Sequence, residues 1–183
     1  VKNTNCGPYS FIGGGSGNTT NGFYSFIGNG LSNNSVGSNS FIGSGNNNSS
    51  GGNNSIVVGG SCNNSVLSYS TVVGGCCNVA WSNLGFIGGG FKNTTCSAYS
   101  FIGNGTLNCN TSSQYNPNDY SIIVGGNSNN TSSSYYGAGR NFIGGGSFNS
   151  IQNTNYSTIV GGSGNTATQC FSTISGGYNN AIG

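Results

Sequence analysis

The sequence predicts an all-β fold, a parallel β-solenoid in the form of a flattened two-strand β-roll with about 11 rungs of 15 residues. Three observations support this prediction. One short motif recurs along the whole chain, its apolar residues follow strand-like rather than helical spacing, and every copy is bounded by glycine and asparagine. A unit this short cannot bury its own apolar face, so successive copies are expected to stack on one another.

The repeated motif is a nine-residue core with the consensus S-[F/T/I]-[I/V]-[G/V]-[G/N/S]-G-x-x-N, present in eleven copies. Its third position is always Ile or Val, its sixth is always Gly and its ninth is always Asn. Successive copies are 15 residues apart for six steps, and then 21, 20, 16 and 15 residues apart. We therefore predict one domain over residues 1–183, with inserted loops at 109–120 and 130–140 that leave one edge of the rod and bring Asp119 near Arg140.

The invariant glycine and asparagine have a mechanical interpretation. One corner of each coil is expected to need a positive φ, which Gly adopts freely and Asn tolerates. The third-position Ile or Val is predicted to face the inside of the coil, where it is buried. With rungs stacked about 4.8 Å apart, the coil would form a rod about 50 Å long.

The second and fourth positions of the motif vary together. Where the second is Phe the fourth is Gly, and where the second is Thr or Ile the fourth is Val or Ser. Residues two apart in a strand share a face, so this exchange of large for small side chains indicates a packed surface. We predict that this face meets another chain; the alternative is an aromatic ladder left partly exposed. The candidate interface residues are Phe11, Phe26, Phe41, Phe86, Phe101 and Phe142.

These repeats resemble the head repeats of trimeric autotransporter adhesins, and also repeats of phage fibres and other extracellular filaments. The resemblance covers nearly the whole chain and implies a left-handed parallel β-roll that trimerises through a strand face and serves in surface adhesion. The frequent cysteines and aromatic residues of this chain depart from the family pattern. The matching residues are the S-F-I-G stretches at Ser10, Ser25, Ser40 and Ser100, and the small residues Thr20, Ser35, Ser50, Ser65, Ala80, Thr95 and Ala167, each two after the repeat asparagine.

The composition argues against an enzyme, a cofactor or a metal site. The chain has no His and only one acidic residue, so no paired carboxylates, Ser-His couple or acidic calcium cage can be assembled. Three scattered cations form no basic stripe for nucleic acid. The apolar runs are far shorter than the ~20 residues of a membrane-spanning helix. We therefore expect no catalysis, no nucleic-acid binding and no membrane insertion.

Seven cysteines in an Asn-, Ser- and Thr-rich chain suggest an oxidising, extracellular location. Cys62 and Cys77 occupy the same position of consecutive rungs, about 5 Å apart, and are predicted to form a disulfide. Cys96 and Cys109 also lie on consecutive rungs, two positions out of register, and are a weaker candidate pair. No partner is assigned to the other cysteines, Cys6, Cys76 and Cys170.

Six repeat asparagines begin an N-x-S/T glycosylation sequon. Exposed on a corner, they would carry a row of glycans that keeps a nearly uncharged rod soluble. The alternative is a buried amide ladder, in which stacked side chains bond to one another. These glycosylation candidates are Asn18, Asn33, Asn48, Asn63, Asn93 and Asn129.

The function that these features predict is structural: a subunit of a self-assembling extracellular fibre or adhesin rod, secreted or on a cell or virion surface. Its expected partner is itself, side by side or end to end, since no capping repeat is evident and Cys6 or Cys170 would be near the junction. One alternative is an ice-binding solenoid. The other is a glycan-binding adhesin head that uses inserted-loop aromatic residues, namely Tyr115, Tyr120, Tyr135 and Tyr136.

Overall fold

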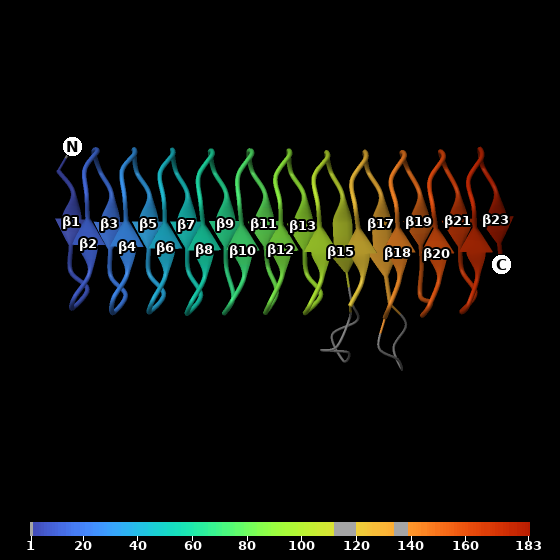
Figure 1. Ribbon diagram of the computed structural model, residues 1–183, viewed down its shortest axis with the longest axis horizontal. Helices are drawn as coiled ribbons and strands as arrows, with labels where there is room; N and C mark the ends of the chain where they lie inside the picture. Colours follow the sequence, from blue (N-terminus) through green and yellow to red (C-terminus); the bar gives the residue numbers. More distant parts are fainter. Residues whose placement is uncertain (1, 112–119, 134–138) are drawn as a thin grey trace.

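The computed structural model describes residues 2–111, 120–133 and 139–183. It has the predicted all-β fold, a parallel β-solenoid of two sheets and about 11 turns of about 15 residues. The coils stack in a line, so that the two ends of the chain lie at opposite ends of a straight rod (Figure 1).

The described strands alternate between two parallel sheets, the odd-strand sheet of 12 strands and the even-strand sheet of 11. The odd-strand sheet consists of β1 (Thr4–Asn5), β3 (Thr19–Thr20), β5 (Asn34–Ser35), β7 (Ser49–Ser50), β9 (Asn64–Ser65), β11 (Val79–Ala80), β13 (Thr94–Thr95), β15 (Cys109–Thr111), β17 (Asn130–Ser132), β19 (Ser150–Ile151), β21 (Thr166–Ala167) and β23 (Ala181–Ile182). The even-strand sheet consists of β2 (Phe11–Ile12), β4 (Phe26–Ile27), β6 (Phe41–Ile42), β8 (Ile56–Val57), β10 (Thr71–Val72), β12 (Phe86–Ile87), β14 (Phe101–Ile102), β16 (Ile122–Ile123), β18 (Phe142–Ile143), β20 (Thr158–Ile159) and β22 (Thr173–Ile174).

Each strand pairs with the strand two further along the chain, at the same position of the repeat. Phe26 pairs with Phe41 and Ile27 with Ile42, for example, so that identical positions form columns along the rod. A third line of single-residue bridges, the bridge column, begins at Ser16 and Leu31 and ends at Tyr178. The repeat register derived from the sequence is therefore the hydrogen-bonding register of the sheets.

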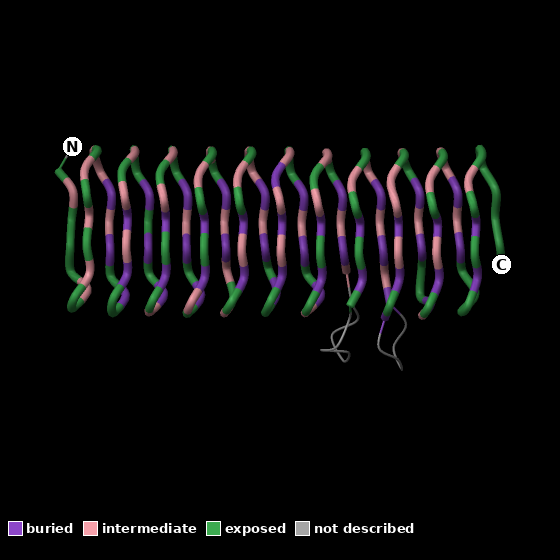
Figure 2. The backbone as a smooth tube through the Cα atoms, viewed as in Figure 1, coloured by how far each residue is buried: buried purple, intermediate pink, exposed green. Residues whose placement is uncertain are grey.

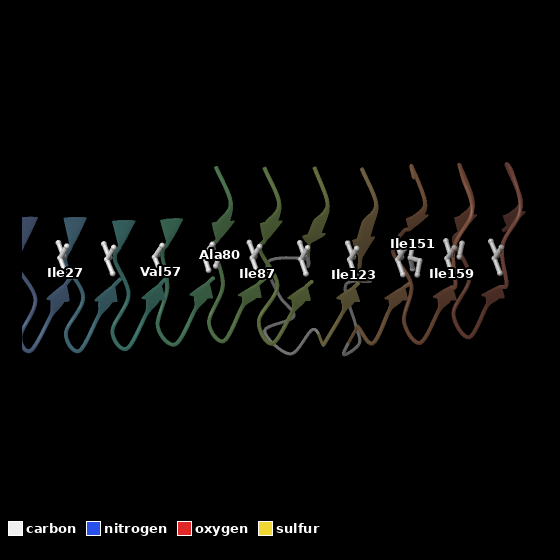
Figure 3. Close-up of a cluster of buried hydrophobic side chains, with 13 residues drawn as sticks. Ile27, Val57, Ala80, Ile87, Ile123, Ile151 and Ile159 are labelled. Atoms are coloured by element: carbon white, nitrogen blue, oxygen red, sulfur yellow. The ribbon is translucent and has the colours of Figure 1, made fainter. Parts of the chain in front are cut away.

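The core contains one column of large aliphatic side chains. The third-position residues of the motif are buried from Ile27 to Ile174, and Ile12 in the first described rung is partly buried, which confirms the predicted orientation. Figure 3 shows these side chains in a row between the two sheets. The facing positions of the odd-strand sheet are mostly small, such as Thr20, Ser35 and Ala80, because two strands this close leave little space between them.

The rest of the interior is polar and hydrogen-bonded. Ser40, at the first position of the motif, is 1% exposed; its Oγ donates to the Gly37 carbonyl at 2.6 Å and lies 2.6 Å from Ser35 Oγ. Buried positions alternate with exposed ones along the inner coils of the rod (Figure 2). Burying so many hydroxyl and amide groups is tolerable only because each rung supplies hydrogen-bond partners for them.

Each typical coil has three corner positions with positive φ, where the sequence predicted one. The invariant sixth-position glycines have φ from 84° to 121°. Two further corners hold mostly residues other than glycine in the left-handed region, such as Tyr69 with φ 60° and Leu107 with φ 56°. The sequence gives only a weak sign of these two corners, because Gly and Asn occupy them in a few rungs, such as Gly17 and Asn54, while Tyr, Leu, Cys and Lys are unusual there.

The inserted segments begin as strand. The predicted loops at 109–120 and 130–140 start with Cys109–Thr111 and Asn130–Ser132, which pair with each other and lengthen the odd-strand sheet by one residue. The segments that leave the sheet therefore begin after Thr111 and Ser132, later than the predicted loop starts. The predicted approach of Asp119 to Arg140 lies outside the described residues.

Candidate functional site

The candidate site is a surface, the outer face of the even-strand sheet. It is formed by the second- and fourth-position columns of the motif and is called the Phe face below. Phe11 is 55% exposed, and Phe41 and Phe101 are each 37% exposed. In a single chain this face is therefore open to solvent, as in the aromatic-ladder alternative, and the predicted burial against another chain stays a prediction.

The phenylalanines of the Phe face stack where they occupy consecutive rungs. The ring centroids are 5.4 Å apart for Phe11 and Phe26, 5.3 Å for Phe26 and Phe41, and 5.2 Å for Phe86 and Phe101. The spacing follows the rung separation, so each pair adds about 0.5–1.5 kcal/mol to the contact between coils.

The contact between the second and fourth positions contributes to their covariation. A β-carbon added at Gly13 would lie 3.3 Å from Cε1 of Phe11, and one at Gly43 would lie 3.4 Å from Cε1 of Phe41, although the nearest atom in both cases is a carbonyl oxygen of the next rung at 2.4 Å. The ring of each Phe thus covers the backbone of the glycine two residues later. Rungs with a smaller second residue, such as Thr71, leave room for a valine there.

A second exposed column follows one corner of the rod. Its rings stack at centroid distances of 5.1 Å for Tyr9 and Tyr24 and 4.9 Å for Tyr99 and Tyr120. In this stacked arrangement the rings turn their faces toward their neighbours and their edges toward solvent.

Arg140 takes the place of an aromatic ring in this corner column. Its guanidinium carbon lies 5.8 Å from the ring centre of Tyr120 and 5.3 Å from that of Tyr156, and its Nη1 donates to Tyr156 Oη at 3.3 Å. Sequence reasoning missed this role, although Arg140 stands directly before the motif, where Tyr usually stands. Of the tyrosines proposed for glycan binding, Tyr120 is in this column, while Tyr115, Tyr135 and Tyr136 lie outside the described residues.

The predicted disulfides are not formed. All seven cysteines are free, including Cys62, Cys77, Cys96 and Cys109. Cys77 Sγ lies instead 3.1 Å from the Sγ of its chain neighbour Cys76. Cys96 and Cys109 are offset by two residues on adjacent strands, a diagonal separation of about 7–8 Å that exceeds the usual range for a disulfide. Burial raises the pKa of the Cys109 thiol to about 11, with a smaller contribution from Cys96.

The six asparagines predicted as glycosylation candidates point into the rod. Asn18, Asn33, Asn48, Asn63, Asn93 and Asn129 are each 0–1% exposed. Asn63 is typical: its Nδ2 donates to the carbonyls of Gly59 and Gly75, both at 2.9 Å, and its Oδ1 accepts from the backbone N–H of Asn78. The amide-ladder alternative is the one found. The exposed glycan column is wrong for these six residues, because a glycan on the buried nitrogen has no space in the folded rod.

The described parts of the chain contain no group of three or more His, Cys, Asp or Glu side chains arranged to hold a metal ion. No helix there is long and apolar enough to cross a membrane.

Comparison with known proteins adds no family to the fold. Neither the protein-family models nor the curated protein sequences match this chain. The fold and surface of the chain therefore have to be interpreted from its own geometry. It is a parallel β-solenoid whose exposed surface includes an apolar face.

Proposed function

We propose that this protein is a structural subunit of a self-assembling extracellular fibre or adhesin rod, and that copies associate side by side through the Phe face. The observation that carries the proposal is the apolar, uncharged strip that follows the even-strand sheet along the rod. Large exposed apolar strips on soluble proteins usually mark interaction surfaces.

The strip has the size of a protein interface. Its large apolar residues are Phe11, Phe26, Phe41, Ile56, Val58, Val73, Phe86, Phe101, Ile122, Val124, Phe142 and Val160. The more exposed of these side chains range from 36% exposed for Ile56 to 55% for Phe11. If each of the twelve gives up on the order of 70 Å², one partner buries on the order of 800 Å², which is the share of each partner in a standard interface.

The proposed partner is a second copy of the chain because the Phe face can pack against an identical face. Its columns contain no charged residue, so two copies meet without like-charge repulsion. Lys92 and Arg140 lie on corners outside these two columns. A contact of this kind closes at two copies, or at three around a common axis, so the Phe face by itself accounts for a bundle of parallel rods.

The two alternative functions receive less support. Ice binding calls for a regular hydroxyl lattice, whereas the outward column of the odd-strand sheet changes from Thr19 to Asn34 and later to Val79. Glycan binding by aromatic stacking needs free ring faces, and the rings of the corner column are stacked face to face, as in Tyr9 and Tyr24.

The test compares the assembly state of three variants by sedimentation velocity and negative-stain electron microscopy. We expect the wild-type protein to form laterally associated species, and Phe26→Lys and Phe101→Lys to remain folded but sediment as single rods, because each buries an unpaired charge in the interface. Thr94→Lys, on the outward column of the opposite sheet, is the matched control and is expected to assemble normally. Wild-type protein that stays a single rod at its highest soluble concentration would refute the proposal.

A further inference from the structure

Three cysteines gather on one corner of the rod, away from the Phe face. Cys76 lies in the bridge column, and Cys77 follows it at a corner position with φ 61°. Their Sγ atoms are 3.1 Å apart, and both residues are half-buried. Cys62 occupies the corner position of the preceding rung, and Lys92 that of the following rung.

The close pair is poorly placed to become a disulfide. Cys76 and Cys77 are neighbours joined by a trans peptide, so their Cα atoms are about 3.8 Å apart. Disulfides usually span about 4.4–6.8 Å between Cα atoms. The two sulfurs therefore lie on the same side of the chain as a preformed pair of thiols.

The distance between the two Sγ atoms determines which coordination geometry a bound centre can have. A linear two-coordinate soft ion with bonds of about 2.3 Å would hold its sulfurs about 4.6 Å apart. A pyramidal centre with bond angles near a right angle would hold them about 3.3 Å apart for the same bond length. The observed 3.1 Å fits the pyramidal centre. Soft thiolate ligands also prefer a soft centre.

We propose that Cys76 and Cys77 form a bidentate thiolate site for a trivalent, pyramidal thiophilic centre such as an organoarsenic(III) compound. With phenylarsine oxide the reaction is an exchange without oxidation. Two As–S bonds form, the two S–H bonds and the arsenic–oxygen bond break, and the oxygen leaves with both thiol protons as water.

The surroundings of Cys77 modulate this reaction. The hydrogen bond with Cys76 is the largest influence and raises the pKa of the Cys77 thiol, and desolvation and the charge of Cys76 add to it. A hydrogen bond with Cys62 and the charge of Lys92 act in the opposite direction. Chelation removes both thiol protons and the thiolate is the nucleophile, so the reaction is expected to proceed faster as pH rises from 7 to about 9.

The test uses the complete, reduced protein and phenylarsine oxide, followed by intact-mass spectrometry. We expect one arsenical to remain bound after washing with the monothiol 2-mercaptoethanol and to be removed by the dithiol 2,3-dimercaptopropanol. Cys76→Ser and Cys77→Ser are expected to lose the retained arsenical, while Cys62→Ser keeps it. Circular dichroism checks that each variant has the wild-type fold.

The matched control is Cys96→Ser, which removes a thiol from the other cysteine pair and is expected to leave the retained arsenical unchanged. Retention that persists in Cys76→Ser, or that disappears in Cys96→Ser, would place the site elsewhere and overturn the proposal. Complete loss of the arsenical from wild-type protein in the monothiol wash would also overturn it, because a single thiol rather than a chelating pair would then be the ligand.

Discussion

The ninth-position asparagine uses its whole side chain to join its own rung to the next one. In Asn78 the amide nitrogen donates to Gly74 within its own turn and to Gly90 of the next, and the amide oxygen accepts from the backbone of Asn93. Aspartate would lose both donated bonds and bury a charge, and serine is too short to reach. Hence Asn occupies the ninth position of every copy. The glycosylation sequons that begin at six of these positions suggested an exposed site, whereas the side chains are buried.

A second residue-scale feature is the Cys109 thiol, whose pKa burial raises to about 11 from an ordinary value of 9.0. The folded chain holds this proton more tightly than the unfolded chain, so the resulting stabilisation is complete below pH 9. It is lost as pH rises from 9 through 11. We expect the free energy of unfolding to fall by roughly 2 kcal/mol over this range because of Cys109.

The measurement is urea denaturation at intervals from pH 7 to 11 for the wild type and Cys109→Ser. The variant should show a shallower loss of stability above pH 9, and the difference between the two curves isolates this thiol. Parallel curves would mean that the thiolate of Cys109 is solvated in the folded chain.

At the scale of the coil, the corners decide the path of the chain. The sixth-position glycine lies where the backbone of one rung touches the next, and its φ is outside the range comfortable for other residues. A β-carbon on Gly45 would lie 2.2 Å from the Gly60 carbonyl oxygen and 2.5 Å from Asn48 Nδ2, at φ 108°. Both sterics and the asparagine ladder thus require glycine.

Gly45→Ala is therefore expected to destabilise the rod by roughly 3 kcal/mol or more, through strain and displacement of the adjacent carbonyl. Gly74→Ala is the matched control, because a β-carbon there has nothing within 4 Å. Its effect should stay within about 0.5 kcal/mol. Chemical denaturation of both variants measures the difference, and equal effects would show that the rungs shift freely to accept the methyl group.

The whole molecule is a stack in which each rung contacts mainly its neighbours. Ile102 of β14 is fully buried and pairs in register with Ile87 of β12 and Ile123 of β16. Stability in such a one-dimensional array is a sum of rung and interface contributions, so damage in one rung should remain local.

We expect Ile102→Asp to destabilise the rod by about 4 kcal/mol, since it places an unpaired charge in a core one side chain thick. In hydrogen-exchange mass spectrometry, exchange should accelerate in β12, β14 and β16 and change little in β4 and β6. Asn104→Asp puts the same charge on the exposed side of the same rung and is the control. A uniform acceleration along the whole rod would indicate that the stack unfolds as a single cooperative unit.

The sequence by itself determined the class of fold, the repeat register and the buried third-position column from Ile27 to Ile174. This was possible because each rung of a solenoid is the previous rung shifted along the rod axis. A residue type that recurs at a fixed spacing in the sequence therefore forms a column in the structure. The link between Phe11 and Gly13 was also visible in the sequence, since neighbouring volumes on one strand face must compensate each other.

Only the tertiary structure decided which way the corner residues turn. Whether Asn63 faces a glycan or a carbonyl, and whether Cys77 contacts Cys62 or Cys76, depends on the positive φ angles of corners that Tyr, Cys and Leu share with Gly. Those angles follow from the hydrogen bonds to the rungs on either side, such as that from Cys77 N–H to the Ser61 carbonyl at 2.9 Å. Contacts between rungs outweigh the local backbone preference of a single residue. The corner conformations therefore form only once the coils have stacked.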